Sequence, residues 1–305
     1  MISIIIPTYN AQKTIQECLE KVIQEAERLE SEILVVDDCS KDKTVEIIKN
    51  FKNVKLIELD KNQGVGNARN MGVEASKYEN LCFIDSDIRI SNQSIVNLLK
   101  RLEKDEVTGS VSATQDLFNL NRESWSSNFV CLKSCYGVDE IDDEITFSVC
   151  CSEFCVMKKK LFVEIGKWKT VSDAGGEEFD IGYKITQLNK KNIKTKSATY
   201  SGYWHNLNTR FIRLIQRTSK YIPLFLKKKK FDSKGSFATL GQVFSSLITL
   251  IIIFYITVSI FFNIPFTILG LIVLIILQLI VEFNFLMFAK KNYGIKMIIF
   301  SLFGI

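Results

Sequence analysis

The sequence predicts an α/β fold with a mixed, mostly parallel sheet and flanking helices, followed by a C-terminal transmembrane helical hairpin. Over residues 1–210, short apolar runs alternate with segments whose apolar residues recur at helical spacing. This alternation is typical of parallel strands joined by crossover helices. From Ser236 to Val281 the chain has no charged residue, which is typical of membrane helices. We therefore divide the 305-residue chain into a soluble domain 1–210, a basic segment 211–235 and a transmembrane region 236–305.

The alternation is clearest in the first part of the chain. Strands are expected at 2–6, 33–36, 54–58 and 81–84, and helices at 14–29, 43–51 and 66–76. In such a sheet, ligands bind beyond the carboxyl ends of the strands. The polar residues that follow each strand are therefore the first candidates for a binding site.

The pattern loosens after residue 87. We expect a helix at 93–103, a strand at 109–113, a variable polar region to about residue 144, a strand at 147–157 and a helix at 178–189. The soluble domain should end at about residue 210.

Two apolar segments near the C-terminus, about 240–262 and 266–288, each provide the roughly 20 residues that a helix needs to cross a membrane. The turn between them is uncharged, whereas Lys227–Lys230 and Lys290–Lys291 flank the outer ends. Because positively charged flanks stay on the cytoplasmic side, we expect a multi-pass membrane protein with a cytoplasmic soluble domain. Glu282 is expected to reach the interface or to pair with a neighbouring lysine. The alternative is a helical hairpin buried in a soluble protein.

The basic residues gather just before the apolar region. The formal net charge is only +5, but cations occur without acidic residues among them at Arg210, Arg213, Arg217, Lys220 and Lys227–Lys230. With apolar residues between the cations, 211–226 is predicted to be an amphipathic helix at the membrane surface, facing anionic headgroups or phosphate. No nucleic-acid module accompanies the cations, so we expect no nucleic-acid partner.

The cysteines and the N-terminus point to the cytosol. The eight cysteines form no Cys-x-x-Cys pair, and a single histidine leaves too few partners for a zinc site of the usual spacing. The chain opens directly on the strand-like run 2–6, without the basic region or cleavage site of a signal peptide. We expect reduced thiols and a soluble domain that stays in the cytosol.

Four polar motifs follow the expected strands. They are Ser3–Asn10 (SIIIPTYN), Val35–Thr44 (VVDDCSKDKT), Asn62–Gly72 (NQGVGNARNMG) and Phe83–Asp87 (FIDSD). The glycines, helix start and arginine of the third motif can meet a phosphate. The fourth ends a strand in Asp-x-Asp and presents oxygen ligands for Mg²⁺ or Mn²⁺ bridging a diphosphate. Taken singly, the acidic motifs also fit turns or helix caps.

In this order, and with Gly175–Asp180 (GGEEFD), the motifs resemble family 2 glycosyltransferases of the GT-A fold over about residues 1–210. The resemblance implies a nucleotide-diphosphate sugar donor, a divalent cation, Mg²⁺ or Mn²⁺, and inversion at the anomeric carbon by direct displacement. It implies that the donor is bound by Pro7, Thr8, Tyr9, Asp38, Arg69, Asp85 and Ser86. It implies that the metal is held by Asp85, Asp87 and His205.

Inversion also requires a base, because an alcohol is a poor nucleophile until its proton is being removed. The family usually has Gly-Glu-Asp-x-Asp, whereas this chain has Gly176–Asp180 (GEEFD), so the usual aspartate is replaced by Glu178. Glu178 is the candidate base and Glu177 the alternative. A different interpretation of the pair is a helix N-terminus stabilised by the macrodipole.

The leading functional prediction is transfer of one sugar to a hydroxyl of a membrane-associated glycan or lipid. A single addition is favoured because Gln216–Lys220 lacks the Gln-x-x-Arg-Trp sequence of the processive synthases that the family contains. Three alternatives stay open. The first is a polyprenyl-phosphate acceptor. The second is a nucleotidyltransferase, which would have a basic, glycine-rich loop where Pro7–Asn10 stands. The third is a non-catalytic membrane scaffold that retains the fold.

Overall fold

The computed structural model describes residues 1–121, 124–136, 142–147, 149–169, 177–204, 209, 240–262 and 267–303. Contacts divide the chain into two compact units. The first comprises Met1–Cys131 and Ile141–Lys229, and the second comprises Leu132–Glu140 and Lys230–Ile305. The predicted boundaries at residues 210 and 235 lie outside the described residues, so the three-part division stays a prediction.

The alternating strands and helices predicted for the first unit are present. Its strands are β1 (Ile2–Thr8), β2 (Ser31–Asp37), β3 (Lys55–Glu58), β4 (Asn80–Ile84), β5 (Ile88–Ile90), β6 (Thr108–Asn119), β7 (Glu144–Phe147), β8 (Phe154–Lys158) and β9 (Lys191–Gly202). Its helices are α1 (Ile15–Ala26), α2 (Thr44–Ile48), α3 (Val65–Ala75), α4 (Ser94–Leu102), α6 (Lys159–Glu164) and α7 (Glu177–Gln187), and α5 (Trp125–Cys135) begins in this unit.

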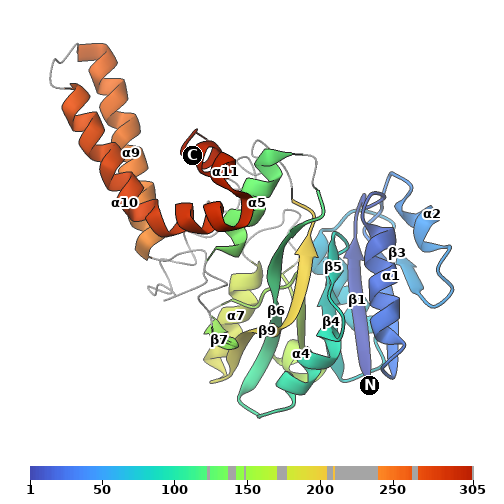
Figure 1. The fold of residues 1–305 in the computed structure, drawn as a ribbon. Helices are drawn as coiled ribbons and strands as arrows, with labels where there is room; N and C mark the ends of the chain where they lie inside the picture. Colours follow the sequence, from blue (N-terminus) through green and yellow to red (C-terminus); the bar gives the residue numbers. More distant parts are fainter. Residues whose placement is uncertain are drawn as a thin grey trace. The chain divides into compact units, whose positions relative to one another are not determined.

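The strands form one mixed sheet (Figure 1). The strand order is β3-β2-β1-β4-β8-β6-β9-β5, with β7 also paired to β9. Pairs β1·β2, β1·β4, β2·β3 and β6·β9 are parallel. Pairs β4·β8, β6·β8, β5·β9 and β7·β9 are antiparallel. The sheet is therefore mixed, as predicted, but among the described residues parallel pairs are no majority and dominate only its N-terminal half.

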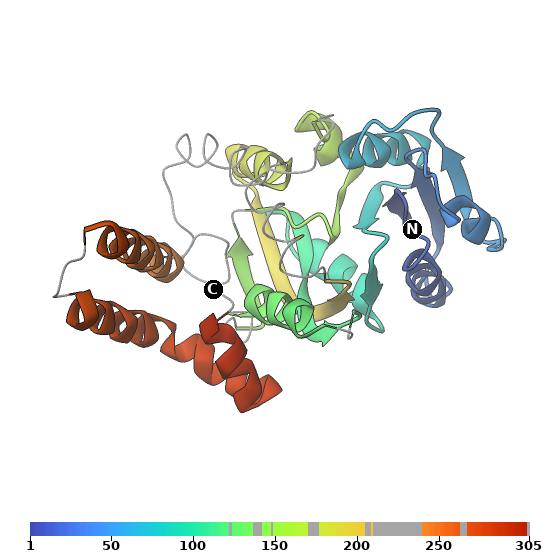
Figure 2. The same cartoon turned by 90° about the horizontal axis from the view of Figure 1, so that it is seen from above.

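Helices cover both faces of the sheet (Figure 2). Side chains alternate along a strand, so Ile4 and Ile6 of β1 pack with α1 and α4, whereas Ile5 packs in a second cluster with α3, α6 and α7. Gly72 of α3 permits this close packing, because a Cβ at that position would lie 2.4 Å from Cγ2 of Ile5. The three layers hold the carboxyl ends of β1, β2 and β4 at one edge.

The later strands differ from the sequence prediction. The single strand expected at 147–157 is wrong, because residues 149–153 turn between β7, which pairs with β9, and β8, which pairs with β4 and β6. Helix α5 lies inside the region expected to be variable. Strand β9 was not predicted, since its sequence KNIKTKSATYSG has few apolar residues to mark a strand.

The second unit contains α9 (Leu240–Phe262), α10 (Thr267–Tyr293) and α11 (Ile295–Phe303). Within the described residues, Gly270–Tyr293 is the helix that is long and apolar enough to cross a membrane. This supports one C-terminal span. The two-span hairpin stays a prediction, and both the turn at 263–265 and the basic segment 211–235 lie outside the described residues.

Glu282 on α10 is the centre of a polar cluster in this unit. Its carboxylate accepts hydrogen bonds from Nζ of Lys133 at 2.9 Å and from Oγ of Ser245 at 2.5 Å. The amide of Gln278 donates to the same serine oxygen at 3.0 Å. Glu282 thus pairs with a lysine, but with Lys133, which is distant in sequence, and not with the neighbouring lysine that the sequence suggested.

Candidate active site

The predicted donor-binding residues lie at one edge of the sheet. The parallel register pairs Thr8 with Asp37 and Ile5 with Phe83, so β1, β2 and β4 end at the same edge. Thr8 closes β1, Asp38 follows β2 and Asp85 follows β4. The sheet therefore brings together three of the motifs that the sequence marked.

The end of β1 offers a hydroxyl and an aromatic ring. Pro7 and Thr8 are buried, and no partner for Oγ1 of Thr8 occurs within the part of the chain that the structure describes. Tyr9 is 48% exposed, which is high for an aromatic residue. A nucleoside placed over Tyr9 would find a stacking surface there.

Asp38 fixes the loop that leads into α3. Its two carboxylate oxygens accept the backbone N–H groups of Gln63 and Gly64, each at 2.8 Å. Gly64 has a φ of 88°, a backbone conformation that favours glycine. A carboxylate has further lone pairs, so Asp38 can still accept a hydrogen bond from the nucleobase of a donor while it holds this loop.

The glycine-rich motif packs α3 against residues 168–169. A Cβ on Gly66 would lie 2.6 Å from the carbonyl oxygen of Lys169. Asn70 donates through Nδ2 to the carbonyl of Trp168 at 2.9 Å and accepts from its backbone N–H at 3.1 Å. The sequence did not single out Asn70 or Trp168, because their partnership joins residues far apart in the chain.

Arg69 on the same helix is buried beneath the Asp-x-Asp segment. It is 2% exposed, its Nη2 donates to Oδ1 of Asp85 at 2.7 Å, and its Cζ lies 5.0 Å from the centre of the Trp168 ring. The guanidinium thus packs on the face of the Trp168 ring and forms an ion pair with Asp85. Arg69 was predicted beside the nucleotide, and its contact with that site runs through Asp85.

The pKa of Arg69 reflects two acidic segments from distant parts of the chain. Burial lowers the pKa of Arg69, but the negative charges of Asp85, Glu178 and Glu177 outweigh burial and raise it overall. Asp85, after β4, contacts Arg69 directly, and the charges at the start of α7 add to the same upward shift.

The Asp-x-Asp segment is anchored by its backbone. Asp85 donates its N–H to the carbonyl of Glu153 at 2.9 Å, and Tyr203 donates its N–H to the carbonyl of Asp87 at 3.1 Å. Ser86 is half-buried between the aspartates, and Asp87 is exposed. The pKa of the Cys18 thiol is raised, first by burial and then by the charges of Asp87 and Asp85. Cys18 lies next to this segment, since its Sγ donates to the backbone carbonyl of Asp85 at 3.6 Å.

The start of α7 holds the two candidate bases. Oε1 of Glu178 accepts a hydrogen bond from Oγ of Ser152 at 2.7 Å. Asp180, one turn into the helix, is paired with Lys169 and Lys184, each at 2.9 Å. Burial raises the pKa of Asp180, and the two lysines lower it by more, so the net shift is downward. Asp180 is thereby committed to an ion pair, which leaves the two glutamates as base candidates.

The carboxylates of Asp85 and Asp87 suit a divalent cation whose remaining ligands come from a bound nucleotide. Across the described residues there is no group of three or more His, Cys, Asp or Glu side chains suited to a metal, and His205 lies outside them. The carboxylates of Asp85 and Asp87, at the sheet edge, are oxygen donors of the kind that Mg²⁺ and Mn²⁺ prefer. Mg²⁺ is commonly bound through one or two carboxylates together with substrate phosphates, so a diphosphate would complete the ligand set.

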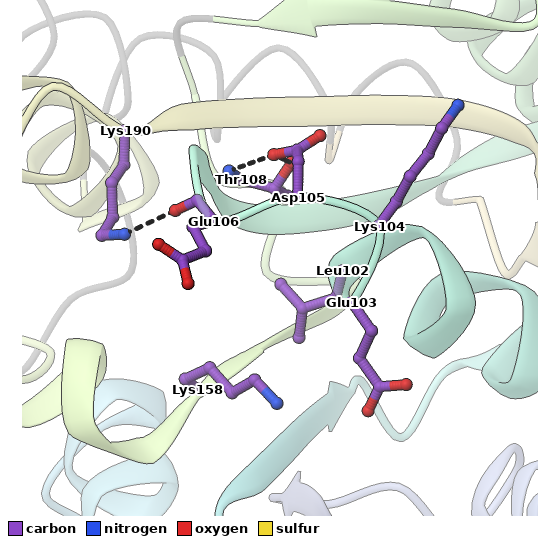
Figure 3. A pocket seen from close by; sticks show the side chains of 8 residues that line it. All are labelled: Leu102, Glu103, Lys104, Asp105, Glu106, Thr108, Lys158 and Lys190. Atoms are coloured by element: carbon purple, nitrogen blue, oxygen red, sulfur yellow. Dashed lines mark hydrogen bonds between the residues drawn. The ribbon is translucent and has the colours of Figure 1, made fainter.

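A pocket of about 510 Å³ lies at the opposite edge of the sheet (Figure 3). It is lined by residues at the starts of β6 and β9 and at the end of β8, including Thr108, Lys190 and Lys158. Lys158 pairs in register with Asn80 at the start of β4, which places the pocket at the amino ends of the parallel strands. Ligands of such sheets bind at the carboxyl ends, so we do not assign this pocket to the active site.

Comparison with known proteins matches this arrangement. Residues 3–166 match the family model described as glycosyl transferase family 2. The chain is 26% identical over 194 residues to a poly-β-1,6-N-acetyl-D-glucosamine synthase of Staphylococcus epidermidis, covering 60% of this chain and 45% of that one. It is 37% identical over 98 residues to the poly(ribitol-phosphate) β-N-acetylglucosaminyltransferase TarS of Staphylococcus aureus, covering 30% of this chain and 17% of that one. The chain thus spans less than half the length of these relatives.

A solved structure shares the fold. The mannosyltransferase PcManGT from Pyrobaculum calidifontis, in complex with GDP-Man and Mn²⁺, superposes with a TM-score of 0.56 at 20% identity, over 73% of this chain and 66% of that one. The mixed sheet, the motifs at its carboxyl edge and the family match over more than half of the chain agree, and the resemblance seen in the sequence is confirmed. The chain belongs to glycosyl transferase family 2.

Proposed function

We propose that this protein transfers one sugar from a nucleotide-diphosphate donor, with inversion, to a hydroxyl of a membrane-associated glycan or lipid at the cytoplasmic face. The observation that supports this most strongly is that the turn at 150–153 contacts both acidic segments: Oγ of Ser152 donates to Oε1 of Glu178 at 2.7 Å, and the N–H of Asp85 donates to the carbonyl of Glu153 at 2.9 Å. A donor-side carboxylate and two candidate bases then share one site. Direct displacement needs this combination, because the nucleophile is deprotonated while the diphosphate departs.

In this proposal the donor lies along the carboxyl edge of the sheet. Pro7, Thr8, Tyr9 and Asp38 bind the nucleoside, and Asp85 and Ser86 bind the ribose and diphosphate. Asp85 and Asp87, together with His205, would hold Mg²⁺ or Mn²⁺, which would neutralise the charge of the leaving diphosphate. Arg69 orients the Asp85 carboxylate through their 2.7 Å contact.

Glu178 is the proposed general base. It accepts the proton of the acceptor hydroxyl as the oxygen attacks the anomeric carbon from the side opposite the diphosphate. Its carboxylate is held by Ser152, whereas Glu177 is the alternative base on the same turn of helix. In this proposal the exposed Asp87 binds the metal and the donor diphosphate, whereas the glutamates of α7 act on the acceptor.

The membrane part of the proposal starts from α10. One span, Gly270–Tyr293, is supported by length and composition. We infer that α9 crosses as well, because it extends over 23 residues without a charged side chain. A hairpin of α9 and α10 would keep Lys227–Lys230 and Lys290–Lys291 in the cytoplasm with the catalytic domain.

The known relatives support the donor class. The name of each staphylococcal protein mentions N-acetylglucosamine as the sugar and also mentions a polymer. The similar mannosyltransferase structure holds a GDP sugar and Mn²⁺. A UDP- or GDP-sugar is therefore the donor class to test first, together with a divalent cation.

The experiment that tests the proposal is a screen of radiolabelled UDP- and GDP-sugars with the full chain in membranes and Mn²⁺, followed by lipid extraction. We expect radiolabel in the lipid phase or in lipid-linked glycan. Radiolabel confined to a water-soluble product would contradict a membrane acceptor. Absence of transfer together with absence of nucleotide-dependent thermal stabilisation would favour the scaffold alternative.

The same assay separates the two acceptor classes. A polyprenyl phosphate is already ionised and needs no carboxylate base, whereas an alcohol does. Glu178→Gln should therefore lower transfer by about 10²-fold or more with a hydroxyl acceptor. Full activity of this variant would favour the phosphate acceptor.

A further inference from the structure

We propose that the turn at residues 150–153 is a positioning element that sets the place of Glu178 relative to the Asp-x-Asp segment, and that the Ser152 hydroxyl orients the Glu178 carboxylate. This inference rests on the proposed function, in which Glu178 takes the acceptor proton. It adds Ser152, a residue outside every motif that the sequence marked.

The turn holds Glu178 at two points. Ser152 is 2% exposed, and its Oγ donates to Oε1 of Glu178 at 2.7 Å. The backbone N–H of Cys150 donates to the carbonyl oxygen of Glu178 at 3.3 Å. One contact orients the side chain and the other fixes the backbone of the first turn of α7. Ser152 thus contacts the base from a buried, fixed position.

The same turn is attached to the donor side. Asp85 donates its backbone N–H to the carbonyl of Glu153 at 2.9 Å, and the next residue, Phe154, pairs in register with Ile84. Cys150 packs in the buried cluster that contains Phe83. Four consecutive residues therefore link the strand that carries Asp85 to the helix that carries Glu178.

This link has a chemical consequence. A proton transfer needs the base within hydrogen-bond reach of the acceptor oxygen, and a displacement of about 1 Å costs much of the rate. A hydroxyl that donates to a carboxylate also favours the ionised, proton-accepting form. Removal of the Ser152 hydroxyl should therefore slow the chemical step and make the base active only at higher pH.

The test compares Ser152→Ala with the wild-type full chain in membranes, using radiolabelled UDP-N-acetylglucosamine and GDP-mannose as donors with Mn²⁺. We expect kcat to fall about tenfold. The KM for the donor should stay within about twofold, because the donor contacts remain. The acidic limb of the kcat/KM profile should move up by about one pH unit. Ser152→Thr keeps the hydroxyl and should return that limb toward its wild-type position.

Ser110→Ala is the matched control. Ser110 is 0% exposed in β6, and its Oγ donates to Oδ1 of Asn192 at 2.7 Å, so the variant loses a buried hydrogen bond of the same length. It should lose stability without a shift of the pH profile. If Ser152→Ala matches Ser110→Ala in kcat and pH profile while Glu178→Gln is inactive, the positioning role is overturned and the proposed function stands. If Glu178→Gln keeps wild-type activity, both the hydroxyl-acceptor mechanism and the positioning role are overturned.

Discussion

Arg69 and Asp85 form an ion pair in which Nη2 of the arginine lies 2.7 Å from Oδ1 of the aspartate. The arginine side chain is 2% exposed, and the aspartate is 25% exposed. The pair thus has a buried cationic end and a carboxylate end open to the site. The carboxylate can meet a donor while its orientation is set from within the core.

Arg69→Met should impair both stability and transfer. The variant keeps an apolar side chain against Trp168 but leaves Asp85 without its cation. Breaking a fully buried pair costs about 3–5 kcal/mol, and since Asp85 can be hydrated we expect about 1–2 kcal/mol. Chemical denaturation measures this loss, and the radiolabel assay should show transfer lowered at least about tenfold. Unchanged values in both measurements would contradict the role of the pair.

Gly66→Ala should destabilise the fold. The added methyl would lie 2.6 Å from the carbonyl oxygen of Lys169, which is backbone and cannot rotate away. Overpacking of this kind costs about 1–3 kcal/mol, measurable by urea unfolding. Asn67→Ala, at the next position of α3, should change the free energy of unfolding by about 0.5 kcal/mol or less. Equal effects of the two variants would exclude a tight contact at Gly66.

Asp180→Asn should show a pH-dependent loss of stability. The pKa of Asp180 is lowered in the folded state, so the ionised group stabilises the fold above its unfolded pKa of about 3.9. That contribution is lost as the pH falls through the lowered pKa. The difference in unfolding free energy between wild type and variant should be full above about pH 5 and should shrink below about pH 4. If the difference in unfolding free energy stays constant over this pH range, the ion pairs of Asp180 with the two lysines contribute nothing to stability.

Lys133→Met should destabilise the second unit more than the double variant Lys133→Met/Glu282→Gln. The single variant leaves the Glu282 carboxylate, whose side chain is 11% exposed, without its cation. Removing both charges avoids this unpaired carboxylate. Thermal unfolding in detergent should rank wild type highest and the single variant lowest. A double variant less stable than Lys133→Met would show that Glu282 contributes apart from its charge.

The local pattern of apolar and polar residues predicted the first half of the fold well, but it predicted fewer elements of the second half. Strands β1, β2 and β4 contain apolar runs bounded by polar motifs, so their positions follow from the sequence. β9 is rich in lysine, serine and threonine and becomes a strand through its pairing with β6, which no local pattern reveals. The run 147–157 is apolar but contains the turn at 149–153, because Phe147 ends β7, which pairs with β9, whereas residues 154–157 belong to β8, which pairs with β4.

The candidate site divides in the same way. The carboxylates of the Asp-x-Asp segment and of α7 were predicted, because each stands in a motif of recognisable composition. Ser152, Asn70 and Trp168 were missed, since their roles depend on hydrogen bonds to residues far away in the chain. His205 and the basic segment 211–235 lie outside the described residues, so their predicted roles stay predictions.

The most direct measurement is the affinity of the full chain for Mn²⁺, monitored by EPR of free Mn²⁺ without nucleotide and with UDP or GDP. We predict that one of these nucleotides tightens Mn²⁺ binding about tenfold or more, since in the proposed site its diphosphate would complete the ligand set of Asp85 and Asp87. Asp87→Asn should remove most of that gain, whereas Asp180→Asn should keep it. Mn²⁺ affinity that is independent of both nucleotides, or equal in wild type and Asp87→Asn, would contradict a shared metal and diphosphate site at this edge of the sheet.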